Sequence, residues 1–477
     1  MVRVLSLAVG IVLADSAIVT LALPQILREL DAEVSEVAWV LTAYNLVLGL
    51  AAVPAARMSL TAARAPLAGV AGLIVFAAAS AACALAGSLE MLIGARVVQA
   101  IGGALVITAC LELLVQATGD AHRGAARWAT AGVIGAAVGP VAGGLLTEAL
   151  SWQAIFFVQV PLVLLAIPAA WALRERPEDP EWAAEAATAV HPLQGGTADR
   201  PRVAANLALA LLSAALTAAL FLLVLLMIEG WQRSPTITAI TVTVIPVAAI
   251  LSGTVARLAQ ASTRSEAVAG SILIGGGLIA LAFLPGAEPA WTIAPQALIG
   301  LGLGLTVESL TAFALRDRFP RALQGGWTIA SRHLGIVVGL LILTPIFVSG
   351  LTDARAPAQQ AIAGIVIDAP LPVSTKLTLA GELGEQLDAE RGRVPDLAPA
   401  FEATPIAPAD RREASALAVQ LDDQLERAAT QAFQNAFLVA GLLALLAIVP
   451  ALLIRDVDRR EPDDHAPTQA TPGTVTA

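Results

Sequence analysis

The chain has 477 residues, of which 57% are hydrophobic and only 14% are charged, and its mean hydropathy is +0.77. A soluble globular domain carries about 25% charged residues, so a soluble protein is excluded and lipid must surround much of this chain. The net charge of −10 comes from acidic residues outside the apolar segments. It says little about partners, and we expect no nucleic-acid partner.

Long apolar segments recur along the whole chain. A bilayer core of about 30 Å requires roughly 20 apolar residues of a helix, and the hydrophobic pattern predicts twelve such spans. The first is too long for a signal peptide, contains Asp15 and is followed by further spans. The predicted spans cover residues 4–27, 37–57, 65–87, 91–117, 126–148, 153–173, 203–228, 235–256, 266–285, 291–315, 323–349 and 431–454.

Two polar segments interrupt the spans and suggest the domain organisation. The first is rich in Pro, Gly and charge and divides the spans six plus six. The second is acidic and rich in Ala and Leu. Its helical periodicity predicts short amphipathic helices that cap the outer mouth, although a solvated spacer fits equally well. The predicted domains are an N-terminal six-helix bundle (1–174), a linker (175–202), C-terminal bundle helices 7–11 (203–349), an insert (350–430), helix 12 (431–455) and a disordered tail (456–477).

The distribution of arginine predicts the orientation. Cytoplasmic segments of membrane proteins carry an excess of Lys and Arg. With the N-terminus in the cytoplasm, most arginines fall in inner segments, while the short outer loops hold only Arg28 and Arg233. We therefore expect a multi-pass protein of the cell membrane, with both termini and the linker in the cytoplasm and the insert outside.

A few ionisable residues lie inside the predicted spans. Charges there are costly and are candidates for function, although each could instead belong to a buried pair that only fixes packing. Three of them lie nearer the predicted cytoplasmic ends, where they could snorkel or brace an inner gate: Glu112, Glu308 and Arg332. The others are Asp15, Arg96 and His333, which adjoins Arg332.

Asp15 lies near the middle of the first span. A carboxylate at that depth can bind and release a proton as its exposure to water changes. Arg96 and Gln99 share one face of the fourth span. An Arg stays charged, so Arg96 can modulate a carboxylate or bind a substrate acceptor. Whether Arg96 reaches Asp15 is left open by the sequence.

A glycine stripe marks the fifth span, in GVIGAAVGPVAGG. Gly135, Gly139 and Gly143 recur every four residues, and Pro140 and Gly144 lie among them. Small residues let neighbouring helices approach closely, so the stripe could seal against leak or serve only as a packing face. The eleventh span repeats the GxxxG core at Gly335 and Gly339, which is consistent with two related halves.

Together these residues resemble the major facilitator superfamily, in particular its fourteen-span drug:proton antiporter branch. The resemblance is specific over about residues 1–175, looser over 203–349 and absent from 350–430. The stretches that carry it are LADSAIVTLALPQI in the first span, WVLTAYNLVLG in the second, Arg96 to Gly103 in the fourth, Gly135 to Gly144 in the fifth, and SWQAIFFVQVPL entering the sixth.

The resemblance implies a fold and residue roles. The fold would be all-α and integral to the membrane, with two six-helix bundles related by a pseudo-two-fold axis. Asp15 and Arg96 would take part in proton coupling. The substrate cavity would be lined by Tyr44, Asn45 and Gln99. The antiporter motif, with Gly135, Gly139, Pro140, Gly143 and Gly144, would bias the protein towards exchange.

The sequence departs from this family in two respects. It has twelve predicted spans, because the central extra pair is missing. In the loop between spans two and three, AARMSLTAARAPL keeps Arg57 and Arg64 but lacks the acid that helps to lock the family's inner gate. The family's charge lock is therefore incomplete here, and Glu112, Glu308 and Arg332 are candidates to replace this lock.

We therefore expect a monomeric, proton-coupled secondary transporter that works by alternating access, namely a multidrug exporter of the drug:proton antiport type. Its substrate would be a small lipophilic or cationic molecule, and its other partners protons and membrane lipid. The alternative is an exporter of an endogenous lipid, metabolite or peptide with the same fold. We expect no enzyme activity, cofactor or metal. Cys83 and Cys110 lie in apolar runs. Lys376 is the one lysine and lies outside any phosphate-binding loop.

Overall fold

The computed structural model describes residues 1–60, 64–175, 202–259, 261–316, 320–389 and 395–454. These residues form helices joined by short loops, and no strand occurs among them. Within these described ranges, twelve helical segments are long and apolar enough to cross a membrane, so the predicted all-α fold with twelve spans is confirmed. Most of the predicted linker and the whole predicted tail, 456–477, lie outside the described residues.

The first six spans form the N-terminal half. Five are single helices, and the sixth consists of α6, α7 and a short 3₁₀ turn, η1. Their bounds are α1 (Val2–Glu29), α2 (Val34–Met58), α3 (Arg64–Ala84), α4 (Leu89–Thr118), α5 (Ala121–Ala149), α6 (Trp152–Leu164), α7 (Ile167–Ala172) and η1 (Leu173–Glu175).

The C-terminal half holds the other six spans and the insert. Its first span ends in a short π-helix, η4, and its second is divided into α10 and α11. The bounds are α9 (Val203–Leu225), η4 (Leu226–Gly230), α10 (Pro235–Val242), α11 (Val244–Ala259), α12 (Thr263–Leu281), α13 (Pro289–Leu315), α14 (Arg321–Asp368), α15 (Val373–Ala389), α16 (Ala398–Ala403), η5 (Pro408–Asp410), α17 (Arg411–Leu446) and α18 (Ile448–Leu452).

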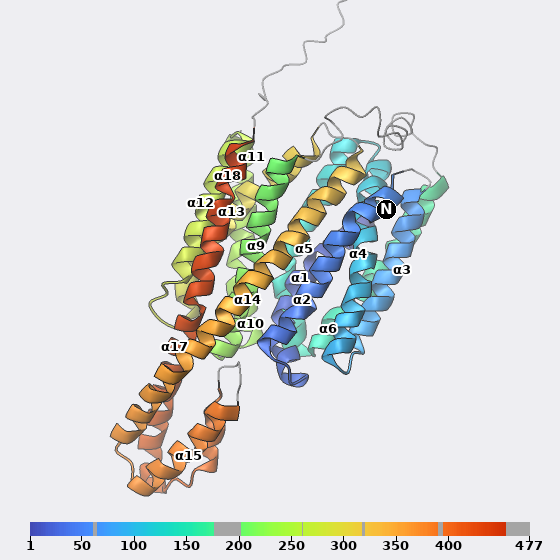
Figure 1. The fold of residues 1–477 in the computed structure, drawn as a ribbon. Coiled ribbons are helices and arrows are strands. Elements are labelled where there is room, and N and C mark those ends of the chain that lie inside the picture. Colours follow the sequence, from blue (N-terminus) through green and yellow to red (C-terminus); the bar gives the residue numbers. More distant parts are fainter. Residues whose placement is uncertain (61–63, 176–201, 260, 317–319, 390–394, 455–477) are drawn as a thin grey trace, which may run out of the picture.

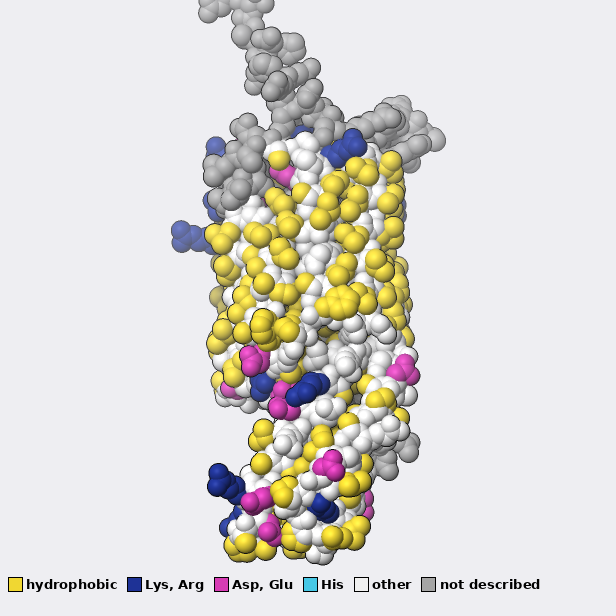
Figure 2. Space-filling view, turned by 90° about the vertical axis from the view of Figure 1, so that its left-hand side faces the viewer, with side chains coloured by type: hydrophobic (Ala, Val, Ile, Leu, Met, Phe, Trp, Pro, Cys, Tyr) yellow, Lys and Arg dark blue, Asp and Glu magenta, His cyan; other side chains and the backbone are white. Residues whose placement is uncertain are grey.

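The two halves stand side by side with their long helices roughly parallel (Figure 1). We call the end at which α1 begins the N-terminal face, and the opposite end, from which the insert projects, the insert face. Hydrophobic side chains cover the side of the bundle shown in Figure 2, while charged side chains gather towards its ends and on the insert. This distribution fits a lipid-facing band between two polar surfaces.

Short polar side chains set several helix starts. The first backbone N–H groups of a helix have no partner within it, and Ser or Asp at the N-cap can accept from them. Ser88 accepts from the amide of Met91 at 3.2 Å before α4. Asp120 accepts from the amide of Arg123 at 2.9 Å before α5. These caps help to set the positions at which α4 and α5 begin.

Glycine stripes join equivalent helix pairs in the two halves. In α5, a Cβ added to Gly135 would overlap the carbonyl oxygen of Gly10 in α1. In α14, Cβ atoms added to Gly335 and Gly339 would overlap backbone carbonyls of α9. The fifth span therefore packs on the first as the eleventh packs on the seventh, which is the relation expected for two six-helix repeats.

The insert is built from extensions of two membrane helices. α14 continues as one helix to Asp368, and α17 begins at Arg411 before it enters the bundle. With α15 and α16 they enclose a separate apolar cluster that includes Ile362, Leu379 and Leu421. The insert projects from the end of the C-terminal half (Figure 1). An ion pair of 3.2 Å between Arg233 and Glu426 links α17 to the segment between η4 and α10.

Candidate functional site

Asp15 lies at the centre of a buried polar network in the N-terminal half. Its side chain, on α1, is fully buried, and its Oδ2 forms an ion pair with Nη1 of Arg96 on α4, which is also fully buried. Oδ1 accepts from Gln159 Nε2 at 3.0 Å and from Gln99 Nε2 at 3.4 Å. The carboxylate thus meets a cation and two amide donors, an environment suited to its charged form.

The two glutamines connect this carboxylate to the surrounding helices. Arg96 Nη1 donates to Gln99 Oε1 at 2.7 Å. Gln99 Nε2 lies 2.8 Å from Ser80 Oγ on α3 and 3.2 Å from Gln159 Oε1 on α6. Four helices of one half therefore meet at Asp15, so a change in its charge would disturb contacts among all of them.

Arg96 is enclosed on its other sides. Its Cζ lies 3.8 Å from the ring centroid of Tyr44, a distance at which a cation–π attraction is expected. Its Nε donates to the carbonyl oxygen of Val40 at 3.3 Å, whereas Nη2 is buried without a hydrogen-bond partner. The positive charge of the guanidinium is thus compensated mainly by the carboxylate of Asp15.

A second set of contacts extends from Asp15 to the other half. Ser16, its neighbour in sequence, donates to Asn45 Oδ1 at 3.4 Å. Asn45 Nδ2 donates to the carbonyl oxygen of Leu41, so Oδ1 is the acceptor for Nδ1 of His333, at 2.7 Å. His333 belongs to α14, and this bond therefore crosses between the halves.

The structure brings together six of the residues that the sequence singled out: Asp15, Tyr44, Asn45, Arg96, Gln99 and His333. Arg57, Arg64 and Glu308 are exposed, and Glu112 is buried on α4. Arg332 is partly exposed beside His333, at the level of Asn45. The sequence reasoning missed Gln159, Ser80 and Ser16. Gln159 carried a signal, because it is an amide within the otherwise apolar run FFVQVPLVL.

The glycines of the antiporter motif divide between two neighbours. Gly135, Gly139 and Gly143 face α1. A Cβ added to Gly139 would lie 3.1 Å from the carbonyl oxygen of Ala14. A Cβ added to Gly143 would lie 2.5 Å from the carbonyl oxygen of Ile18. Asp15 lies between those contacts, so α5 supports the segment of α1 that carries the carboxylate. Gly144 faces α10 instead, where its Cβ would lie 2.9 Å from the carbonyl oxygen of Pro235.

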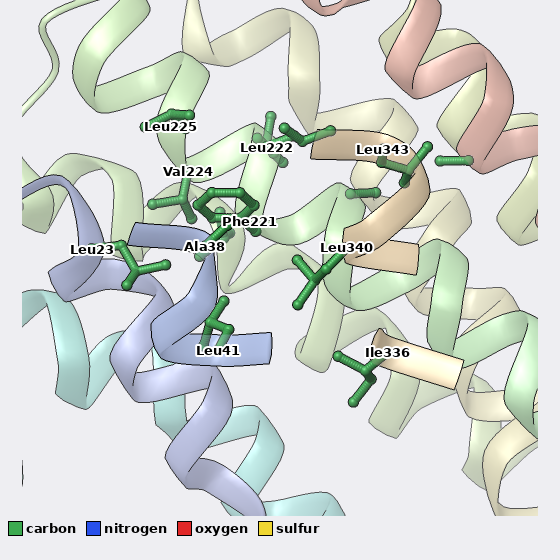
Figure 3. Close-up of a cluster of buried hydrophobic side chains, with 14 of the residues drawn as sticks. Leu23, Ala38, Leu41, Phe221, Leu222, Val224, Leu225, Ile336, Leu340 and Leu343 are labelled. Carbon is green, nitrogen blue, oxygen red and sulfur yellow. The ribbon is translucent and has the colours of Figure 1, made fainter. Parts of the chain in front are cut away.

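Apolar side chains close the seam between the halves towards the insert face. Figure 3 shows this cluster, which we call the apolar plug. The residues come from α1 and α2 on one side and from α9 and α14 on the other, and all are buried. They are Leu23, Ala38, Leu41, Phe221, Leu222, Val224, Leu225, Ile336, Leu340 and Leu343.

An exposed ion pair joins the halves at the insert face, beyond the plug. Nη2 of Arg28, at the end of α1, lies 2.7 Å from Oε1 of Glu229 in η4. Exposed pairs contribute about 0–1 kcal/mol. Arg28→Glu or Glu229→Arg would bring like charges together. We expect either variant to raise, by up to about fivefold, the fraction of molecules in which the two halves are separated at this face. The double variant Arg28→Glu/Glu229→Arg should restore the original fraction.

Distance measurements between spin labels on the two halves would test this pair. Both native cysteines, Cys83 and Cys110, are buried, so introduced cysteines can be labelled selectively. Single and double variants with identical distance distributions would show that the pair has no influence on closure.

A cavity of about 480 Å³ lies between α2 and α14 near the insert face. Its lining includes Trp39, Thr42, Leu340 and Thr344, and no lining side chain is charged. Residues Tyr44, Asn45 and Gln99, predicted to line a substrate cavity, are not part of this lining. They are fully buried in the polar network described above.

Comparison with known proteins identifies relatives among export and efflux proteins. Residues 5–340 match the model of the Major Facilitator Superfamily. The tetracenomycin C resistance and export protein of Streptomyces glaucescens is 36% identical over 35% of this chain and 31% of its own length. The multidrug efflux pump LfrA of Mycolicibacterium smegmatis is 35% identical over 34% of this chain and 32% of its own length. The chain thus matches about a third of the length of these relatives.

Two longer matches cover most of the chain. The probable actinorhodin transporter of Streptomyces coelicolor is 28% identical over 77% of this chain and 74% of its own length. A crystal structure of a bacterial homologue of the human lysosomal transporter Spinster, inward-facing and unoccupied, superposes with a TM-score of 0.55. It is 17% identical and covers 95% of this chain and 97% of its own, which establishes likeness of fold. With twelve candidate membrane spans among the described residues, arranged in two related halves, and a family match over residues 5–340, the chain belongs to the Major Facilitator Superfamily.

Proposed function

We propose that this chain is a proton-coupled exporter of small molecules that works by alternating access, as a drug:proton antiporter. The observation that carries the proposal is the buried ion pair between Asp15 and Arg96. A charged pair within a membrane-spanning bundle is costly to keep and marks a functional site by default. The relatives include a tetracenomycin C resistance and export protein and a multidrug efflux pump, which supports this assignment.

The pair offers a way to couple a proton to movement. Arg96 keeps its charge at all relevant pH values, so Asp15 is the member that can bind a proton. A proton on Asp15 would neutralise the carboxylate and so remove its attraction to Arg96. The carboxyl group, which now accepts a hydrogen bond from Gln159, could then donate one. The contacts of Ser16 and Asn45 would transmit this rearrangement to His333 on the other half.

The sequence supports a location and an orientation in the membrane. The apolar band supports a multi-pass membrane protein, and the arginine distribution supports cytoplasmic termini, with the insert and the plug towards the outside. In this orientation the plug would close the outer side. The protein would act as a monomer, because each half contributes one side of the seam.

A test uses the purified full-length protein in liposomes. We expect an imposed pH gradient to drive accumulation of cargo from a chemical panel, and cargo added without a gradient to cause proton movement. Both effects should disappear with a protonophore. Accumulation driven by a sodium gradient alone, or cargo movement without any proton movement, would contradict proton coupling.

A further inference from the structure

Arg332 lies on the face of α14 that looks into the seam between the halves. Residues four apart in a helix share a face, so Arg332 continues the row formed by Ile336 and Leu340. Both of these residues belong to the apolar plug (Figure 3). Arg332 therefore lies one turn beyond the plug, towards the N-terminal face. Its neighbour His333 contacts Asn45 at the same level.

Within the part of the chain that the structure describes, the guanidinium of Arg332 has no counter-charge. Among the described residues, no carboxylate lies within ion-pair distance of it and none of its nitrogens makes a hydrogen bond. Its side chain is partly exposed, so water or a ligand can reach it. An uncompensated charge at this depth is expected to face a water-filled cavity or a substrate path.

Asp15 is in the opposite situation. It is fully buried, paired with Arg96 and further engaged by Gln159. A cationic molecule in the seam would therefore find this carboxylate sealed and already compensated. Among the described residues, Arg332 instead offers a molecule in the seam a partly exposed positive charge.

We propose that Arg332 is the cargo-binding cation of this transporter and that its cargo is a lipophilic molecule bearing an acidic group, such as a carboxylate or phenolate. The proposal rests on the proposed function, because it takes the seam as the path of the cargo. It replaces the sequence-based expectation of a cationic cargo.

The chemistry of the site supports an ionised acid with an apolar body. Arginine presents a planar fork of donors that binds a carboxylate through two parallel hydrogen bonds. The adjoining plug offers aliphatic contacts from Ile336 and Leu340 to the remainder of the molecule. A neutral cargo would leave the guanidinium uncompensated, and a cationic cargo would be repelled by it.

This assignment has a consequence for the driving force. Exchange of one incoming proton for one outgoing cation moves no net charge across the membrane. Exchange of one incoming proton for one outgoing monovalent anion moves a net two positive charges into the cell. An inside-negative membrane potential would then drive export directly, in addition to the proton gradient.

Binding of a matched pair of probes tests the proposal without transport. 2-Naphthoate and 2-naphthylmethylammonium share an aromatic body and differ in charge. Their binding to the full-length protein in lipid nanodiscs can be measured by equilibrium dialysis, with empty nanodiscs subtracted. We compare the original chain with Arg332→Gln, Arg332→Lys and Arg3→Gln. The last variant removes an exposed arginine at the N-terminal face and controls for the loss of one positive charge.

We expect 2-naphthoate to bind more tightly than the ammonium probe. Arg332→Gln should weaken naphthoate binding at least tenfold, Arg332→Lys should weaken it less, and Arg3→Gln should leave it unchanged. Gel filtration of each variant would establish that it is folded. Equal or tighter binding of the ammonium probe, undetectable binding of naphthoate, or naphthoate binding unaffected by Arg332→Gln would each overturn the proposal.

The same proteins separate this proposal from the proposed function. Naphthoate binding that depends on Arg332 without any proton-driven transport would refute proton coupling and keep the binding site. Proton-driven, electrically silent transport of a cationic molecule that is insensitive to Arg332→Gln would keep the coupling and refute the acidic cargo.

Discussion

Asp15→Asn is expected to abolish proton-driven transport and to lower the free energy of unfolding by about 3–5 kcal/mol, because it leaves a buried arginine without its counter-charge. Arg96 is fully buried, and Asp15 is the acid that pairs with it. The amide of Asn can still accept hydrogen bonds from Gln99 and Gln159, but it can neither compensate the guanidinium nor take up a proton.

The double variant Asp15→Asn/Arg96→Gln separates these two effects. Removing both charges should restore much of the lost stability, while transport should stay absent because no proton carrier remains. Asp353→Asn, at an exposed position on α14, serves as the matched control and should change stability by less than about 0.5 kcal/mol. Unfolding in detergent and proton-driven uptake in liposomes measure the two quantities. Proton-dependent uptake that persists in Asp15→Asn would refute the role of this carboxylate.

Gly135→Ala and Gly339→Ala are expected to prevent stable packing of the bundle. At each position the added Cβ would overlap a backbone carbonyl, that of Gly10 for Gly135 and that of Ala214 for Gly339. Backbone cannot yield as a flexible side chain can, so two helices must separate. Overpacking typically costs about 1–3 kcal/mol, and contact with backbone should place these variants at or above the upper end. The measurement is the yield and melting temperature of the purified protein.

Two other glycines provide matched controls. Gly94 in α4 and Gly276 in α12 have nothing within 4 Å of an added Cβ. Their replacement by Ala should leave stability unchanged or raise it by up to about 1 kcal/mol, because Ala favours the helix. Equal melting temperatures for Gly135→Ala and Gly94→Ala would contradict the packing geometry described here.

The comparison of the two halves also distinguishes packing from a role in exchange. Gly135 and Gly335 occupy equivalent places, but Gly135 belongs to a stripe whose next members, Gly139 and Gly143, face the segment of α1 that carries Asp15. A pure packing role predicts similar effects at both positions. A role in exchange predicts that mild variants at Gly139, where an added Cβ has more room, alter the ratio of protons to cargo.

The sequence predicted the helices well, because each span is long, apolar and bounded by polar residues. It also singled out Asp15 and Arg96 as ionisable residues within spans, and both are buried in the structure. It could not predict that they form a pair, because the relative rotation of α1 and α4 depends on the packing of all neighbouring helices. For the same reason Gln159 and Ser80 were missed, since a single amide or hydroxyl in an apolar helix has no periodic pattern that points to a partner.

Arg332 shows a different limit of sequence reasoning. Its place near the start of the predicted eleventh span favoured a side chain that snorkels or braces an inner gate. In the structure α14 brings His333 against Asn45, and Arg332 stays at that level. Depth along a helix can be counted from the sequence, but the face that a neighbour leaves uncovered cannot. The contrast between a sealed Asp15 and an accessible Arg332 therefore required the structure.

The continuity of α14 makes the insert a lever arm. The same helix carries Arg332 in the seam and ends at Asp368 at the far end of the insert, and at 1.5 Å per residue these positions are about 54 Å apart. A tilt of α14 by about 10° would therefore displace its tip by roughly 9 Å. Rearrangements too small to follow inside the bundle become large movements in the aqueous phase, so one fluorophore on the insert could report each transport cycle in a single molecule.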